Sequence, residues 1–91
     1  MTVRVQIPPV LRNVVGGKRT LQAEGATLAA VLANMARDNP QLALHLFDEN
    51  GAIRRHVLCI HAATVVRAHD FATHAIKNGE EVILANALAG G

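Results

Sequence analysis

Polar and apolar side chains alternate from the first residues of the chain. Residues 2–7 read Thr-Val-Arg-Val-Gln-Ile, and this period of two predicts a half-buried strand. Pro8-Pro9 ends the strand, because proline lacks the backbone donor that a sheet requires. A second short run, residues 18–23, follows the Gly16-Gly17 pair. We therefore expect an antiparallel hairpin with a long, irregular connection.

The next segment has a helical period. Thr27 stands where a helix N-cap belongs, since its hydroxyl can accept a hydrogen bond from a free backbone N–H group of the first turn. Asn39-Pro40 ends the helix, because proline cannot supply the next backbone N–H group. Between these points one apolar helical face is predicted to pack on the sheet, and it consists of Leu28, Val31, Leu32 and Met35.

The middle of the chain contains shorter elements. Residues 42–46 have a leucine at every second position, which indicates a short turn of helix or an irregular packing segment. Residues 48–51, Asp-Glu-Asn-Gly, are typical of a turn. Residues 57–61 form a mostly apolar run of strand length, and Val65-Val66 is predicted to be a short strand beside it.

The last part of the domain ends in a strand. Residues 71–76 are predicted to form a single helical turn. Asn78-Gly79 is a strong tight-turn signal, and residues 80–85 follow as the final strand. This order of elements predicts an α+β domain in which a mixed sheet clasps one main helix. We place the domain at residues 1–85 and a flexible C-terminal tail at residues 86–91.

Composition narrows the class of protein. Ninety-one residues make one domain, and 51% hydrophobic with 18% charged residues fits a globular chain. The formal charge is +2, and its basic residues are scattered without a basic stripe, so nucleic acid is not an expected partner. No apolar run reaches the roughly 20 residues that span a bilayer. By default we expect a cytoplasmic protein. A domain of this size has little room for a deep pocket, so we expect a protein that partner proteins recognise rather than an enzyme.

Two residue types offer other chemistry. Cys59 is the single cysteine, so no internal disulfide can form, and it lies inside an apolar run. We interpret it as a buried small side chain rather than a reactive thiolate that carries sulfur. The five histidines have no spacing typical of a zinc site, so we predict neither a metal site nor a catalytic residue in this chain.

The tail has a different character. After the final strand the chain reads Asn86-Ala87-Leu88-Ala89-Gly90-Gly91, and six extended residues reach about 20 Å. Two glycines lack Cβ atoms and can thread a narrow channel. The carboxylate of Gly91 is ionised, and it can attack the α-phosphate of ATP to give an acyl-adenylate. A tail that merely frays is the plain alternative.

Several segments together resemble a known family. They are the ending from Asn78-Gly79 to Gly90-Gly91, the opening from Ile7-Pro8 to Gly16-Gly17, and Gly25 with Thr27-Leu28. The chain is similar to the ubiquitin-like sulfur carriers of the molybdopterin synthase small-subunit and thiamine-carrier type, and most to the longer members that serve cysteine synthesis. Asn86-Ala87 departs from the proline that many relatives have near their terminal glycines. Their acidic, Asn-containing turn is replaced here by residues 61–64.

The resemblance implies a β-grasp fold and a thiocarboxylate on Gly91. Gly90, Ala89 and Leu88 would enter an adenylating enzyme related to ubiquitin-activating enzymes, with Leu88 anchoring the tail and ATP used by that partner. No cofactor is expected on the chain itself. Further implied partners are a sulfur donor, a sulfur-accepting synthase and a metallopeptidase that releases the product. The alternatives are the small subunit of molybdopterin synthase, a ubiquitin-like protein modifier, and a β-grasp interaction domain whose tail is never activated.

Overall fold

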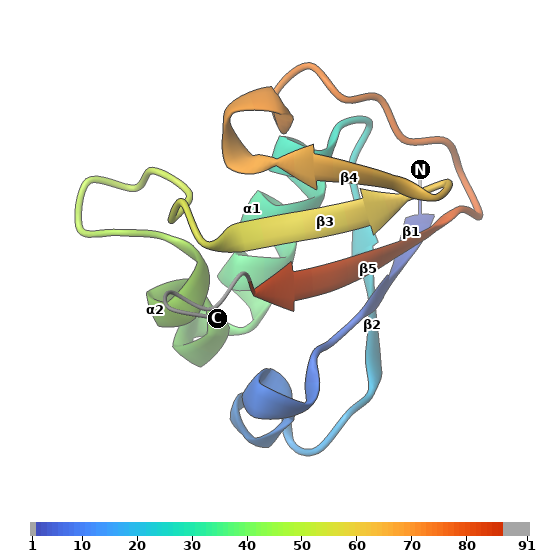
Figure 1. Ribbon diagram of the computed structural model, residues 1–91. Coiled ribbons are helices and arrows are strands. Elements are labelled where there is room, and N and C mark those ends of the chain that lie inside the picture. Colours follow the sequence, from blue (N-terminus) through green and yellow to red (C-terminus); the bar gives the residue numbers. More distant parts are fainter. Residues whose placement is uncertain (1, 87–91) are drawn as a thin grey trace.

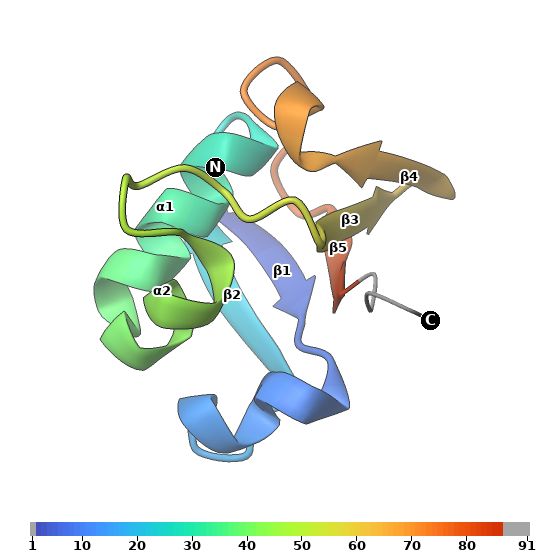
Figure 2. The same ribbon diagram turned by 60° about the vertical axis from the view of Figure 1, so that its left-hand side comes forward.

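The computed structural model describes residues 2–86, which form a five-stranded sheet with helices packed on one face (Figures 1 and 2). The strand order is β2-β1-β5-β3-β4, with β1 and β5 parallel and the other neighbours antiparallel. This confirms the predicted mixed sheet. In chain order the elements are β1 (Thr2–Gln6), the 3-10 helix η1 (Pro9–Val15), β2 (Thr20–Glu24), α1 (Leu28–Asp38), α2 (Pro40–Leu46), β3 (Val57–His61), β4 (Thr64–Arg67), the 3-10 turn η2 (Ala68–Asp70) and β5 (Glu81–Asn86).

Helix α1 is the main helix that the sheet clasps, as the sequence predicts. The side-chain oxygen of Thr27 accepts a hydrogen bond from the backbone N–H of Ala30 at 3.2 Å, which confirms the N-cap. All four residues of the predicted apolar face are buried. Gly25 precedes this helix at close quarters, because a Cβ atom there would lie 2.6 Å from the backbone nitrogen of Val31. A side chain at position 25 would therefore push the helix away from the sheet.

Two short helical segments differ from the sequence prediction, and a third decides between its two alternatives. Helix η1 occupies the connection expected to be irregular, where only Leu11 and Val15 are buried, too few for a recognisable period. Helix α2 forms over the spaced leucines, which confirms the helical alternative for residues 42–46, and Leu44 within it is 72% exposed. The turn predicted over residues 71–76 is wrong in position, since η2 ends at Asp70.

Residues 71–76 are instead an irregular segment held by its ends. Phe71 and Ile76 are buried at 0% and 2% exposure. The carbonyl of Phe71 accepts a hydrogen bond from Ala29, and the N–H of Ile76 donates one to the carbonyl of Ala26. The segment therefore lies along the start of α1 and closes that end of the core.

The strands follow the sequence closely. β3 has the predicted bounds, β4 is longer by one residue at each end than Val65-Val66, and β5 continues to Asn86. Their inward side chains complete an aliphatic core with Phe71 as its one fully buried aromatic residue. Helices among residues 2–86 all fall short of the length and apolar character needed to cross a bilayer.

Candidate docking surface and C-terminal tail

The tail begins at the middle of the sheet. Leu88, Ala89, Gly90 and Gly91 lie outside the described residues, so their predicted roles stay predictions. β5, which leads to them, is the central strand of the five. Its last residue, Asn86, lies opposite the first residue of β3, and β5 continues three residues past its last pair with β1. The tail thus starts between the two halves of the sheet (Figure 1).

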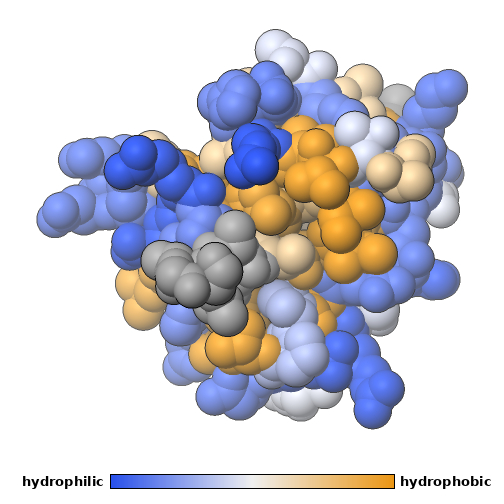
Figure 3. Space-filling model, viewed as in Figure 1, coloured by the Kyte–Doolittle hydropathy of each residue, from blue (hydrophilic) through white to orange (hydrophobic). Residues whose placement is uncertain are grey.

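The outer face of β3, β4 and β5 carries a group of apolar side chains, with Arg67 and Glu81 beside it. Ile60 lies opposite Val65 on one side and Ile83 on the other, and Leu58 lies opposite Ala85. Their neighbours along the strands point into the core, so these five side chains point away from the helices. Val65 is 55% exposed and Ile83 37% exposed. We call this surface, Leu58, Ile60, Val65, Ile83 and Ala85, the apolar face (Figure 3).

The other half of the same sheet face is polar. Residues of β1 and β2 that share the outer side with Ile83 are all polar or charged, and Arg4 lies 3.9 Å from Glu81 across the boundary. Scattered apolar surface residues are normal, but a group gathered on one side of the tail exit is a candidate interaction surface. The polar outward residues are Thr2, Arg4, Gln6, Thr20, Gln22 and Glu24.

Basic residues flank the point where the tail starts. Arg54, Arg55 and His56 directly precede β3, whose first residue pairs with Asn86. The backbone N–H of Arg54 donates to the carbonyl of Leu46 at 2.9 Å, which fixes this segment to the end of α2. Arg55 and His56 are exposed. The point where the tail starts therefore has the apolar face on one side and exposed basic side chains at the adjoining start of β3.

Cys59 is buried, as predicted. Its exposure is 0%, and it lies between Val66 of β4 and Leu84 of β5. Burial raises the pKa of the Cys59 thiol to about 12, because the charged thiolate loses its hydration. The side chain is therefore a neutral thiol at neutral pH, and it is not placed to accept or hand over sulfur.

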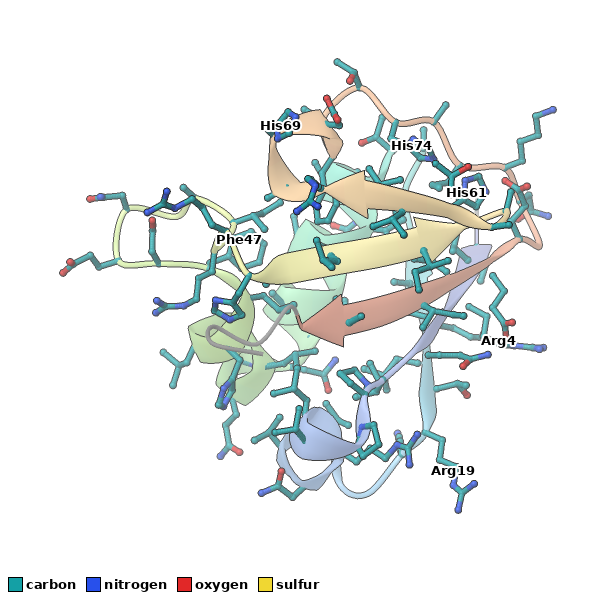
Figure 4. All side chains as sticks on the ribbon, in the orientation of Figure 1. Arg4, Arg19, Phe47, His61, His69 and His74 are labelled. Atoms are coloured by element: carbon teal, nitrogen blue, oxygen red, sulfur yellow. The ribbon has the colours of Figure 1, made fainter. Side chains whose placement is uncertain are left out.

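The structure brings together two histidines that the sequence keeps apart. His61 and His74 are in ring-to-ring contact (Figure 4). Glu80 contacts the other ring nitrogen of His61. Sequence spacing could not reveal this, because the segment after η2 folds back over α1. Residues 2–86 contain no group of three side chains suited to holding a metal ion.

Hollows on the described surface lie elsewhere. One, of about 270 Å³, is lined by Glu24, Asn34 and Arg37 among others, between the edge strand β2 and α1. Another, of about 190 Å³, is formed around Asn78-Gly79 and the outer side of β1. Both are open and polar, and neither adjoins the end of β5. The geometry suits contact with a protein partner better than enclosure of a small substrate.

A mixed sheet around one main helix, with a tail leaving the central strand, defines a β-grasp protein of the ubiquitin-like class. No protein-family model matches the chain. The sulfur carrier protein CysO of Mycobacterium tuberculosis is 32% identical over 93 residues, which cover 100% of both chains. Its crystal structure covers 94% of this chain and 99% of its own, at 27% identity and a TM-score of 0.76. The chain belongs to the family of ubiquitin-like sulfur carrier proteins.

Two further solved structures share the fold. A chain of the BexX/CysO complex of Amycolatopsis orientalis matches with a TM-score of 0.79 and 23% identity, covering 98% of this chain and 99% of that one. SAMP1 of Haloferax volcanii matches over 100% of both chains with a TM-score of 0.82 and 20% identity. The predicted β-grasp fold and the predicted family are thereby confirmed. The CysO relatives that match over the full length are sulfur carrier proteins.

Proposed function

We propose that this protein carries sulfur as a thiocarboxylate on Gly91. The carboxylate attacks the α-phosphate of ATP in a partner enzyme, and pyrophosphate leaves. Sulfide can then attack the acyl-adenylate and release AMP. A persulfide donor gives an acyl disulfide first, and a second thiol cleaves it to leave the thiocarboxylate. The full-length similarity to a sulfur carrier carries this proposal, and the Gly90-Gly91 ending is the chemical feature that it requires.

The partner is proposed to be an adenylating enzyme related to ubiquitin-activating enzymes. Gly90 and Ala89 are small enough to pass through a narrow channel, and Leu88 supplies an apolar anchor. The apolar face would dock on the same partner, since it adjoins the strand from which the tail starts. A CysO protein of Amycolatopsis orientalis forms a complex with BexX, which supports a carrier that works by docking.

The acceptor is proposed to lie in cysteine biosynthesis. A synthase would pass the sulfur to an activated serine derivative, and a metallopeptidase would release cysteine from Gly91. The similarity to CysO proteins over the whole chain supports this branch. The competing candidate is a protein modifier, for which the fold shared with SAMP1, a small archaeal modifier protein, is the supporting observation. The two differ in product, a cysteine adduct or an isopeptide bond to a target lysine.

Intact-mass measurement tests the proposal. With ATP, sulfide and the adenylating enzyme of its own host, the protein should gain the mass of sulfur minus oxygen, and fragmentation should place it at the C-terminal peptide. Deleting Gly91 draws the carboxylate back by about 3.5 Å and should abolish loading, whereas Cys59→Ala should load normally. Sulfur on the Cys59 peptide, or loading that survives deletion of Gly91, would refute the thiocarboxylate.

Gly90→Val supplies a finer control for the tail. The branched Cβ widens the chain and forbids positive φ at that point. A displacement of about 1 Å at a reacting group can lower the rate about a hundredfold. We expect ATP–pyrophosphate exchange to fall at least about tenfold, with an unfolding transition like that of the parent. Parental exchange in this variant would mean that the glycine is not needed for entry.

A further inference from the structure

A side-chain cluster closes the core at the end of the sheet opposite the tail. His61 is the last residue of β3, and it shares the inner side of the sheet with its partner Val82. His74 comes from the irregular segment after η2, and Glu80 immediately precedes β5. The side chain of His61 is 12% exposed, so most of its ring lies inside the rim of the core. Figure 4 shows His61 and His74 pointing toward each other.

The contacts form a chain through the ring of His61. Its Nδ1 lies 2.9 Å from Nε2 of His74, with the rings at 90° to each other. Its Nε2 is buried and lies 3.0 Å from Oε1 of Glu80, close enough for an ion pair although the alignment falls short of a hydrogen bond. The same Oε1 accepts the backbone N–H of Lys77 at 2.7 Å. Three segments are therefore joined at one imidazole.

This arrangement suits protons rather than a metal ion. Glu80 and His74 contact opposite nitrogens of His61, so one ion could not bind all three side chains. The Lys77 N–H lowers the pKa of the Glu80 carboxyl, and the contact with His61 lowers it further. Glu80 is accordingly an acceptor at neutral pH. The nearby Nε2 of His61 must then carry a hydrogen, since a lone pair there would face a carboxylate.

The positions of the hydrogens follow from that assignment. When His61 is neutral, its Nδ1 has the lone pair, so Nε2 of His74 is the donor. The pair can bind one added proton. Whichever ring becomes the cation donates from its nitrogen at the contact, and the facing nitrogen of the neutral ring accepts. A second added proton cannot be bound, since both facing nitrogens would then carry hydrogens 2.9 Å apart.

Other charged groups near the pair do not replace Glu80. Glu81 is on the outer side of β5, near Arg4. His69 and Asp70 of η2 pair with each other at 3.3 Å and are exposed. On β4, Thr64 lies opposite His61, and Arg67 lies at the far end of the strand. The backbone carbonyl of His74 accepts a hydrogen bond from the N–H of Leu28 at 3.1 Å, at the start of α1.

We infer that the contact between His61 and His74 is a proton-operated latch, which ties the middle of residues 71–77 to the end of β3 and opens when both rings are cationic. Opening separates the rings and loosens the turn that leads into β5. Phe71 and Ile76 stay buried in the core, so the change is local. The tail exit lies at the other end of β5, and the apolar face lies on the outer side of the sheet, away from the two rings, so both keep their structure.

Linkage gives the size of the effect. In the unfolded chain both histidines are protonated below about pH 6.5, whereas the closed latch holds at most one added proton. The unfolded state then binds about one more proton than the folded state, so the folding equilibrium constant falls as pH falls. One proton corresponds to about a tenfold change for each pH unit. The loss begins below about pH 6.5 and stops where the latch has opened.

His74→Gln is the matched test. The amide nitrogen of glutamine can donate to neutral His61, and its oxygen can accept from cationic His61, so the contact survives in either state. The folding equilibrium constant is measured by urea unfolding from pH 7.5 to pH 5. For each pH unit, that of the wild type should fall by up to about tenfold more than that of His74→Gln. His69→Gln, which changes an exposed histidine of the neighbouring turn, should follow the wild type.

Two results would overturn the latch. One is a folding equilibrium constant that depends on pH in the same way in the wild type and in His74→Gln. The other is nitrogen NMR at pH 5 that finds both rings cationic while nuclear Overhauser contacts between them persist. Nitrogen shifts at pH 8 should place the hydrogen on Nε2 of both rings, and the opposite tautomer on His61 would also contradict the assignment.

Discussion

Replacing Ile83 by lysine puts a positive charge in the middle of the apolar face, on the strand that leads to the tail. Ile83 lies between Ile60 of β3 and Gln6 of β1 and keeps 37% of its surface exposed. The stem of lysine can cover the same neighbours while its ammonium group reaches water. We therefore expect Ile83→Lys to change the free energy of unfolding by no more than about 1 kcal/mol.

The effect on docking should be larger. Fully burying an isoleucine side chain contributes about 1.5–3 kcal/mol, so covering the exposed 37% contributes about 0.6–1.1 kcal/mol. An unpaired polar group trapped in the interface adds about 1–3 kcal/mol, and more when it is charged. Together these give about 2–4 kcal/mol, or a rise in KM of about thirtyfold to several hundredfold.

ATP–pyrophosphate exchange with the host's adenylating enzyme measures this directly. Gln22→Lys is the matched control, because it adds the same side chain to the same sheet face, in its polar half on β2. We expect a raised KM for Ile83→Lys alone, with little change at saturating carrier. Equal KM values for the two variants would show that the apolar face does not dock on this enzyme.

Three further predictions concern stability. Cys59→Ala should lower the free energy of unfolding by about 1 kcal/mol, because it leaves a small cavity. The wild-type thiol, with a pKa of about 12, should resist maleimide until the protein unfolds. Rapid labelling of the folded protein would contradict the burial of Cys59. Gly25→Ala should cost about 1–3 kcal/mol, because the added Cβ meets the backbone of Val31 at 2.6 Å, and an unchanged melting curve would show that α1 can move. Ala63→Gly should stabilise by about 0.4–1 kcal/mol, since φ is +66° there, whereas Ala72→Gly, at a residue without positive φ, should not.

Elements with a strong local pattern were predictable. The cap at Thr27 and the apolar face of α1 follow from spacing alone, and β3 has the bounds that its apolar run predicts. Helix α2 was predicted only as one of two alternatives, because the leucines alternate along the chain although only Leu42 and Leu46 are buried and Leu44 between them is exposed. Helix η1 was not predicted, because a connection with only two buried residues has too few apolar positions to define a helical period.

The candidate site divides in the same way. The chemistry proposed for Gly91 rests on the sequence alone, because a terminal glycine carboxylate needs no neighbour within its own chain to be activated. The apolar face cannot, since Val65 and Ile83 become neighbours of Ile60 only through the register of three strands. Sequence alone left the middle strand ambiguous, because Val57–His61 is apolar on both sides. The pairing with β5 explains that composition: one side of the strand fills the core, and the other completes the apolar face.

The hairpin that follows β3 shows how far local rules can be overridden. A two-residue loop with positive φ at both positions favours Asn-Gly, yet Ala62 and Ala63 occupy it at +51° and +66°. Four cross-strand pairs between β3 and β4, ending at His61 and Thr64, impose this turn on two alanines, which rarely adopt positive φ. His61 is therefore held at the rim of the core by the sheet rather than by its loop. Relieving the strain at Ala63 should raise stability without moving His61 away from His74, so the pH dependence attributed to the two rings should be unchanged in Ala63→Gly. A loss of that dependence would instead place the proton-sensitive element in the hairpin.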